Sequence, residues 1–231
     1  MGSYEQENQF EPKLVCNKGN MILNEFIIPD TLEKAYNLKF DFKKLNPSKV
    51  NIKALLRPSI YELIEQVTPD LVEKIYILNV LNENDTDVCI ILKSFGNEVG
   101  IKPKYLMFRT SRSINFFSNS IVFYNKDITL IDPTKLLLNN YLKQIQLDTN
   151  KYKPIIFNYG KTVINLHNLE PQELSRLNNE QPLTSLIDIN FSIDFIATIE
   201  DDLPVYMQNI IGLMFKKIFY NLKQFIDSLN V

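Results

Sequence analysis

Residues 187–199 read IDINFSIDFIATI and alternate between apolar and mostly polar side chains. Asp188, Asn190, Ser192 and Asp194 lie between the apolar positions, which are Ile187, Ile189, Phe191, Ile193, Phe195, Ala197 and Ile199. A period of two over this length predicts a β-strand with one buried face and one solvent-exposed face. Antiparallel sheets, which often keep one face in water, are typical of this pattern.

The next residues, EDDLPVYMQNIIGLMFKKIFYNLKQFIDSL at 200–229, predict a long amphipathic helix. Asp201 and Asp202 precede Pro204, as expected of a cap with Pro near the first helical position, and both acids favour the positive end of the helix dipole. One broad apolar face contains Met207, Ile210, Ile211, Met214, Ile218, Leu222, Phe225 and Leu229. Such a helix is roughly 40 Å long and needs a large surface to cover.

The residues before this pair predict mainly antiparallel hairpins. Strands are expected over 21–28, 72–81, 88–95, 105–112 and 118–124. A short helix is expected after Pro29, a second helix over 133–147, and residues 59–67 fit a helix and a strand equally. Residues 155–157 and 162–166 are expected to flank a tight turn at Tyr159 and Gly160. The chain divides into a flexible leader, 1–18, and one domain, 19–231.

Composition excludes several classes of function. The 231 residues contain 25 Lys plus Arg and 27 Asp plus Glu, which argues against a basic nucleic-acid binder. Two Cys residues exclude a disulfide framework and favour a reducing compartment, and a single histidine, His167, cannot build a multi-histidine metal site. No signal peptide and no membrane-spanning run is visible. We therefore expect no cofactor and no metal.

Four passages resemble the START lipid-transfer domains of the Bet v 1-like superfamily. They are ILNEFIIPDTLEKAYNL at 22–38, IKPKYLMFRTSR at 101–112, IIFNYGKTVINL at 155–166, and the passage from Ile189 to Ile226. The last is the most specific, because strand phase, acidic turn, Leu203-Pro204 and helix all agree. The chain departs from the family in lacking its Trp-Asp pair, in having Lys104 where Arg is usual, and in a longer segment at 125–154.

The resemblance implies an α+β helix-grip fold, in which a curved antiparallel β-sheet wraps around a long C-terminal α-helix. It also implies a monomeric, cytoplasmic protein that is not an enzyme. Such a protein binds a lipid ligand, either a phospholipid or a sterol, and transfers it between membranes by transient contact with their surfaces. The apolar cavity under the helix is expected to involve Phe191, Ile193, Phe195, Met207, Ile210, Ile211, Met214 and Ile218. A gate or membrane contact is expected at Leu136, Leu137 and Tyr141.

Other interpretations stay open at this point. The terminal helix and the 136–141 segment are equally readable as helices packed on a sheet, which would suit a protein-interaction subunit with a filled core and no ligand. An enzyme of the cyclase or hydrolase kind needs polar residues pointing inward, and the alternation gives no convincing set. Arg109 and Arg112 have the chemistry to bind a phosphate, but alternation favours solvated side chains. Asp194 and His167 are expected at the surface.

Overall fold

The computed structural model describes residues 12–28, 31, 33–94, 101–169, 173, 175, 183, 185–199 and 209–230. Its main feature is one nine-stranded sheet in the order β1-β2-β3-β9-β8-β7-β6-β5-β4. Neighbouring strands are antiparallel, and a short parallel pairing joins β6 to β8. The strands are β1 Lys13–Lys18, β2 Met21–Ile27, β3 Lys34–Leu45, β4 Val72–Val80, β5 Asp85–Leu92, β6 Lys104–Asn115, β7 Ser120–Asp127, β8 Lys153–His167 and β9 Ile187–Ile199.

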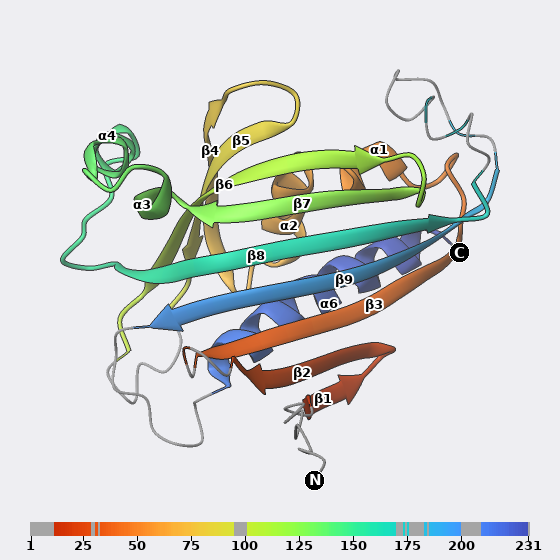
Figure 1. The fold of residues 1–231 in the computed structure, drawn as a ribbon, viewed down its shortest axis with the longest axis horizontal. Coiled ribbons are helices and arrows are strands. Elements are labelled where there is room, and N and C mark those ends of the chain that lie inside the picture. Colours follow the sequence, from red (N-terminus) through yellow and green to blue (C-terminus); the bar gives the residue numbers. More distant parts are fainter. Residues whose placement is uncertain are drawn as a thin grey trace, which may run out of the picture.

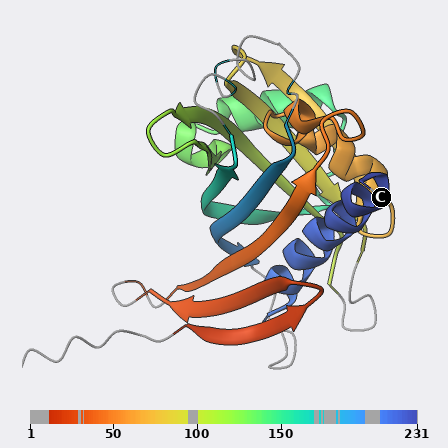
Figure 2. The same cartoon turned by 90° about the vertical axis from the view of Figure 1, so that its right-hand side faces the viewer.

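The helices divide between the two faces of this sheet. The inner face is covered by α1 Ile52–Leu55, α2 Ile60–Val67 and α6 Ile210–Leu229, whose buried residues share one hydrophobic core. The outer face carries α3 Ile128–Ile131 and α4 Leu136–Gln144, which pack on a second, smaller core. Figure 1 shows α6 running along the sheet, and Figure 2 shows the sheet curving around it.

Strand β5 separates the two cores. Val88, Ile90 and Leu92 belong to the inner core, whereas Cys89 and Ile91 belong to the outer one. Because successive side chains of a strand point to opposite faces, this strand is buried on both sides. The run VCIIL has no polar face for that reason.

The structure confirms the helix-grip fold class, with a curved antiparallel sheet and a long C-terminal helix. Strand β9 and both central hairpins form as predicted, and the ambiguous segment 59–67 is the helix α2. The predicted helix over 133–147 is confined to Leu136–Gln144, with α3 as a separate turn before it. The predicted cap at 201–204 lies outside the described residues, and the described part of the last helix begins at Ile210.

Three local predictions are wrong. Lys13–Lys18, predicted as part of a flexible leader, pairs with β2 as an edge strand. The predicted short helix after Pro29 is replaced by β3 from Lys34 onward, because Tyr36, Leu38, Phe40 and Phe42 recur at every second position and bury one face.

The predicted turn at Tyr159 and Gly160 is instead part of the continuous strand β8. This strand has a register shift between Phe157 and Tyr159 where it pairs with β9. A Cβ atom at position 160 would clash with Cε1 of Phe157, so the glycine permits the Phe157 ring to fold back over the strand. Gly160 therefore marks a close approach and not a chain reversal.

Candidate functional site

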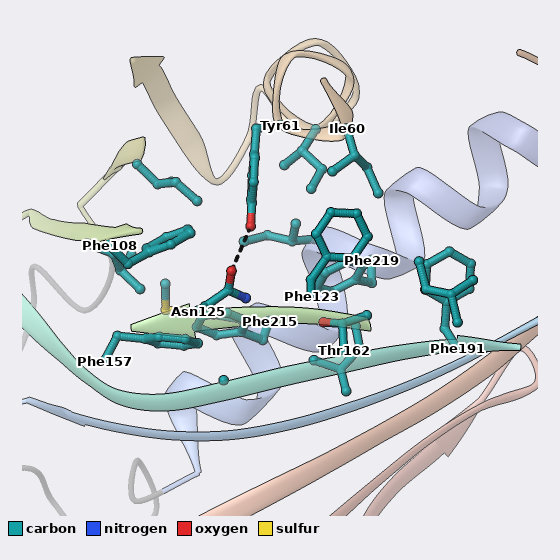
Figure 3. Close-up of a pocket in the computed structure, with 18 of the residues that line it drawn as sticks. Ile60, Tyr61, Phe108, Phe123, Asn125, Phe157, Thr162, Phe191, Phe215 and Phe219 are labelled. Carbon is teal, nitrogen blue, oxygen red and sulfur yellow. Dashed lines mark hydrogen bonds between the residues drawn. The ribbon is translucent and has the colours of Figure 1, made fainter. Parts of the chain in front are cut away.

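An apolar cavity lies between the inner face of the sheet and the helices α2 and α6 (Figure 3). Five strands, β5 to β9, form its floor and sides, and the helices close it. The lining residues are Leu55, Ile60, Tyr61, Ile64, Ile90, Leu92, Leu106, Phe108, Phe123, Asn125, Phe157, Gly160, Thr162, Ile164, Phe191, Ile193, Met214, Phe215, Ile218 and Phe219.

Simple periodicity brings these side chains together. Phe191 and Ile193 are two residues apart on β9 and therefore point to the same face. Met214 and Ile218 are four residues apart on α6, so they lie about one turn apart on the same side of the helix, which faces the sheet. The cavity is thus a product of the strand and helix patterns that define the fold.

Hydrogen-bonding groups in the cavity are few and uncharged. The Tyr61 hydroxyl points from α2 across the cavity and donates to Oδ1 of Asn125 on β7 at 3.3 Å (Figure 3). Burial raises the pKa of Tyr61 to about 12, so its hydroxyl stays protonated at neutral pH. None of the described residues that line the cavity is Asp, Glu, Lys, Arg or His. The site therefore suits apolar chains and a neutral polar group.

The cavity is small as it stands. Its volume is about 80 Å³. Several water molecules fit in such a space, since each requires about 10–15 Å³. Pockets that enclose a drug-sized ligand are typically about 300–1,000 Å³. A lipid chain can therefore enter only if aromatic side chains rotate or a helix moves away from the sheet.

The residues expected in the cavity divide into three groups. Phe191, Ile193, Met214 and Ile218 line it. Phe195, Ile210 and Ile211 pack in the same inner core but do not line the space, and Met207 lies outside the described residues. Phe195 is used instead for packing: its ring stacks on Phe215 of α6 with centroids 4.5 Å apart.

Sequence reasoning missed the polar pair in the cavity. Tyr61 lies in the segment that fits helix and strand equally, so its direction was undefined. The sequence predicts that Asn125 lies in the connection after the second hairpin, whereas β7 extends to Asp127. A signal for Asn125 was present in the alternation of Ile121, Phe123 and Asn125, which continues the inward-facing positions of the strand by one step.

The residues expected as a gate lie on α4, on the outer face of the sheet and away from the cavity (Figure 1). Leu136 is 64% exposed, Leu137 is partly buried and Tyr141 is buried in the outer core. No helix in the described part of the chain is long and apolar enough to cross a bilayer.

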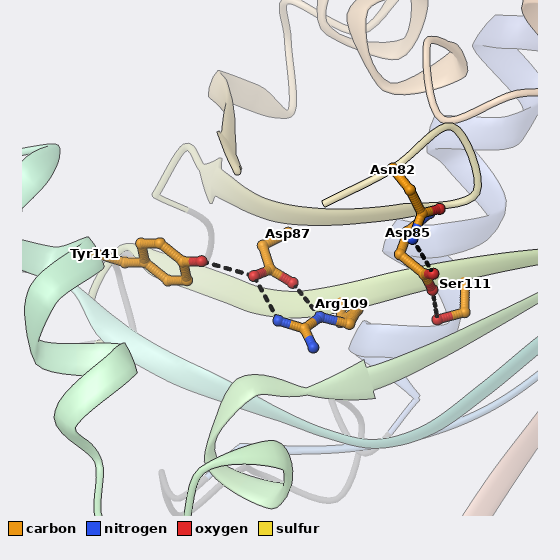
Figure 4. Close-up of polar contacts among 6 residues, drawn as sticks. All are labelled: Asn82, Asp85, Asp87, Arg109, Ser111 and Tyr141. Atoms are coloured by element: carbon orange, nitrogen blue, oxygen red, sulfur yellow. Dashed lines mark hydrogen bonds and ion pairs between the residues drawn. The ribbon is translucent and has the colours of Figure 1, made fainter. Parts of the chain in front are cut away.

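A buried polar network attaches α4 to the sheet (Figure 4). Asp87 of β5 is fully buried and accepts hydrogen bonds from Nε and Nη2 of Arg109 at 2.6 and 2.9 Å. The Tyr141 hydroxyl donates to Oδ2 of the same carboxylate at 2.6 Å. Asp87 raises the pKa of Arg109, and burial, followed by Asp87, raises that of Tyr141 to about 12. The network therefore keeps one charge pair and a protonated phenol beneath α4.

The prediction that Arg109 and Arg112 are solvated is wrong. Arg109 points outward as the alternation predicts, but α3 and α4 cover that part of the outer face. Arg112 is buried, and its Nη1 donates to Oδ1 of Asn84 at 3.3 Å. Asp194 is partly buried and accepts a hydrogen bond from Asn37, whereas His167 is exposed as expected and contacts Asn190.

Tyr141→Phe is expected to lower the free energy of unfolding by about 1.5–3 kcal/mol, the range for a hydrogen bond to a charged group. The substitution removes only the hydroxyl that donates to Asp87 and leaves the packing of α4 in place. Urea denaturation measures the loss. Tyr124→Phe is the matched control, because Tyr124 is exposed and should change stability little. An equal effect of the two substitutions would contradict the assigned role of the network.

Comparison with solved structures completes the description of the site. No family profile and no curated protein sequence matches the chain. Human StAR-related lipid transfer protein 5 is similar in structure with a TM-score of 0.60 at 9% identity, covering 98% of this chain and 89% of that chain. The lipid transfer and protein localization domain of human StarD13 gives 0.57 at 6% identity, covering 96% and 90%.

A STAR-related lipid transfer protein from Xanthomonas axonopodis gives a TM-score of 0.55 at 11% identity, covering 95% of this chain and 99% of that chain. At such low identities these similarities establish the fold alone. They agree with the resemblance in the four sequence passages and with the observed sheet order. The chain therefore has the helix-grip fold of the START lipid-transfer domains.

Proposed function

We propose that this protein binds a lipid in the cavity beneath α6 and carries it between membranes without catalysing a reaction. The observation that carries the proposal is the wall of the cavity, which is apolar apart from the Tyr61, Asn125 and Thr162 side chains. The START-like fold and the lipid-transfer proteins that share it lend further support.

The energetics of transfer explain why a carrier is useful. Each CH₂ group of a lipid chain costs about 0.8 kcal/mol when it is exposed to water. An enclosed apolar cavity removes that cost during transit. Because the cavity is small and closed by helices, loading requires aromatic side chains to rotate or α6 or α2 to move, and we propose that α6 moves. That motion is proposed to occur at the membrane surface, where the lipid passes directly from one apolar environment to the other.

The cavity also constrains the ligand. Tyr61, Asn125 and Thr162 offer neutral hydrogen bonds, which suits the hydroxyl or ester groups of a sterol or of a phospholipid backbone. The protein is proposed to act as a cytoplasmic monomer that touches membranes transiently. The exposed Leu136, flanked by Lys135 and Lys143, is the proposed contact on α4, since an apolar side chain beside cations suits an anionic surface.

Native mass spectrometry tests the proposal directly. The purified chain is incubated with liposomes that contain both phospholipid and sterol and is then separated from them. Its mass is measured under native conditions. We expect a complex with one lipid per chain, which solvent extraction then identifies. Liposome-to-liposome transfer of the identified lipid tests the carrier role. A protein without bound lipid after incubation with every liposome composition would contradict lipid binding.

A second candidate function follows from the small cavity volume. A core with about 80 Å³ of free space is close to filled, as expected of a protein-interaction subunit without a ligand. The exposed apolar residues of the α3–α4 segment, Leu130 and Leu136, would then form the binding patch. The same mass measurement separates the two functions, because only a carrier takes up lipid.

A further inference from the structure

Cys16 and Lys216 form an unusual pair between the edge strand β1 and the helix α6. Lys216 is only 7% exposed, and its Nζ lies 3.1 Å from Sγ of Cys16. Cys16 is partly exposed and packs against the inner core. The pair therefore joins a partly exposed cysteine to a lysine that is almost completely buried.

Lys216 and Lys223 are both buried lysines of α6, but their surroundings differ. Lys223 is equally buried, but it has an ion pair with Asp227 and lies over the Phe42 ring. Among the described residues no carboxylate forms an ion pair with Lys216. Glu25, which faces inward on β2, is already bound by Lys13 and Lys34.

The group that Lys216 contacts is the Cys16 sulfur, and reactive cysteines are characteristically partly exposed with a basic side chain such as lysine close by. Cys89 provides an internal contrast. It is fully buried in the outer core, and burial raises the pKa of its thiol to about 12, so it should be inert.

We infer that Cys16 and Lys216 form an oxidant-sensitive modification site, at which hydrogen peroxide converts the pair into a covalent sulfur–nitrogen bridge between β1 and α6. In the first step the Cys16 thiolate attacks one peroxide oxygen and the O–O bond breaks. The departing hydroxide takes a proton from the Lys216 ammonium group, which leaves a sulfenic acid, a neutral amine and water.

In the second step the Lys216 nitrogen attacks the sulfur. The S–N bond forms, the S–O bond breaks, and the leaving hydroxide takes a proton from the nitrogen to become a second water. The cysteine sulfur has lost two electrons and the peroxide has gained them. Two equivalents of a thiol reductant reverse the change, giving back the cysteine and the lysine and leaving the reductant as its disulfide.

The bridge would fasten the edge of the sheet to the helix that closes the cavity. If α6 must move to load lipid, oxidation should slow loading, and this consequence alone rests on the proposed function. The modification site itself does not depend on lipid binding. Its chemistry and its effect on loading can therefore be measured separately.

Alkylation rates and peptide mass spectrometry test the site on the full chain. At neutral pH we expect iodoacetamide to modify Cys16 about tenfold faster than it does in Lys216→Met, because that substitution removes the basic group beside the sulfur. After treatment with hydrogen peroxide, a proteolytic digest should contain a cross-linked pair of peptides carrying Cys16 and Lys216, short of two hydrogens and separated again by dithiothreitol.

Two variants and one further assay make the result decisive. Lys216→Arg keeps a basic group beside the thiol, so alkylation of Cys16 should stay fast while the sulfur–nitrogen bridge disappears. Cys16→Ser should show neither alkylation at position 16 nor the bridge. Equal alkylation rates in the original protein and Lys216→Met, or oxidation of Cys16 without the bridge, would overturn the inference. Lipid uptake before and after peroxide then tests only the link to loading.

Discussion

Replacing Met214 with Trp is expected to reduce lipid loading at least about tenfold, equivalent to about 1.4 kcal/mol of binding free energy, in a protein that still folds. Met214 is buried on α6 and its side chain lines the cavity. The indole ring would occupy the space that a lipid chain must enter, and the cavity of about 80 Å³ has little volume to spare.

The same substitution should cost some stability. Overpacking a well-packed core typically costs about 1–3 kcal/mol, which a domain of ordinary stability of about 5–15 kcal/mol tolerates. Circular dichroism and urea denaturation establish that the variant is folded. Native mass spectrometry after incubation with mixed liposomes then measures the fraction of the protein that carries lipid.

Leu213→Trp is the matched control for Met214→Trp. Leu213 is the adjacent residue on the same helix, but it is 41% exposed and does not line the cavity. An indole there adds the same bulk on the outside of α6, so loading should match that of the original protein. Normal loading of a folded Met214→Trp variant would contradict the assignment of this face of α6 to the ligand.

The main outline of the fold could be predicted because two patterns in the sequence are long and regular. Seven apolar residues at every second position from Ile187 to Ile199 define β9, which is central in the sheet. The apolar face from Ile210 to Ile226 defines the inner side of α6. When a strand and a helix of this kind follow each other, each supplies the apolar surface that the other needs to cover.

The cavity could be predicted only in part, because its walls depend on contacts between distant segments. The α6 and β9 residues follow from periodicity, but the pairing of Tyr61 with Asn125 depends on where α2 lies against β7. The role of Gly160 could not be predicted from the sequence for the same reason. Its lack of a side chain matters because the Phe157 ring occupies that space, and no local turn pattern indicates this contact.

On the outer face of the sheet, alternation predicts the direction of the Arg109 side chain correctly but not what surrounds it. Alternation along β6 correctly places Arg109 on the face opposite Phe108. The alternation does not show that the segment between β7 and β8 folds back as α3 and α4 over that face. Asp87 and Tyr141 then complete a buried network around an arginine that the pattern alone assigned to solvent.

Phe195→Ala is expected to have the largest effect on stability, a loss of about 3–5 kcal/mol in the free energy of unfolding. The Phe195 ring stacks on Phe215 of α6 at 4.5 Å, on Tyr36 of β3 at 5.2 Å and on Phe157 of β8 at 6.4 Å between centroids. Its removal would leave a void where the helix meets two strands, and close packing there cannot recover without moving α6.

Urea denaturation measures this loss as a lower midpoint with an unchanged slope. Phe195→Leu keeps most of the apolar volume and should lose less, which keeps the prediction testable if the alanine variant does not fold. Phe117→Ala is the matched control, because Phe117 lies fully exposed at the tip between β6 and β7 and should change stability by no more than about 0.5 kcal/mol. Similar losses at Phe195 and Phe117 would mean that Phe195 does not clamp α6 to the sheet. The helix would then have to be held mainly by its other contacts, such as Tyr36 against Gly212, where an added Cβ would lie 2.5 Å from the ring.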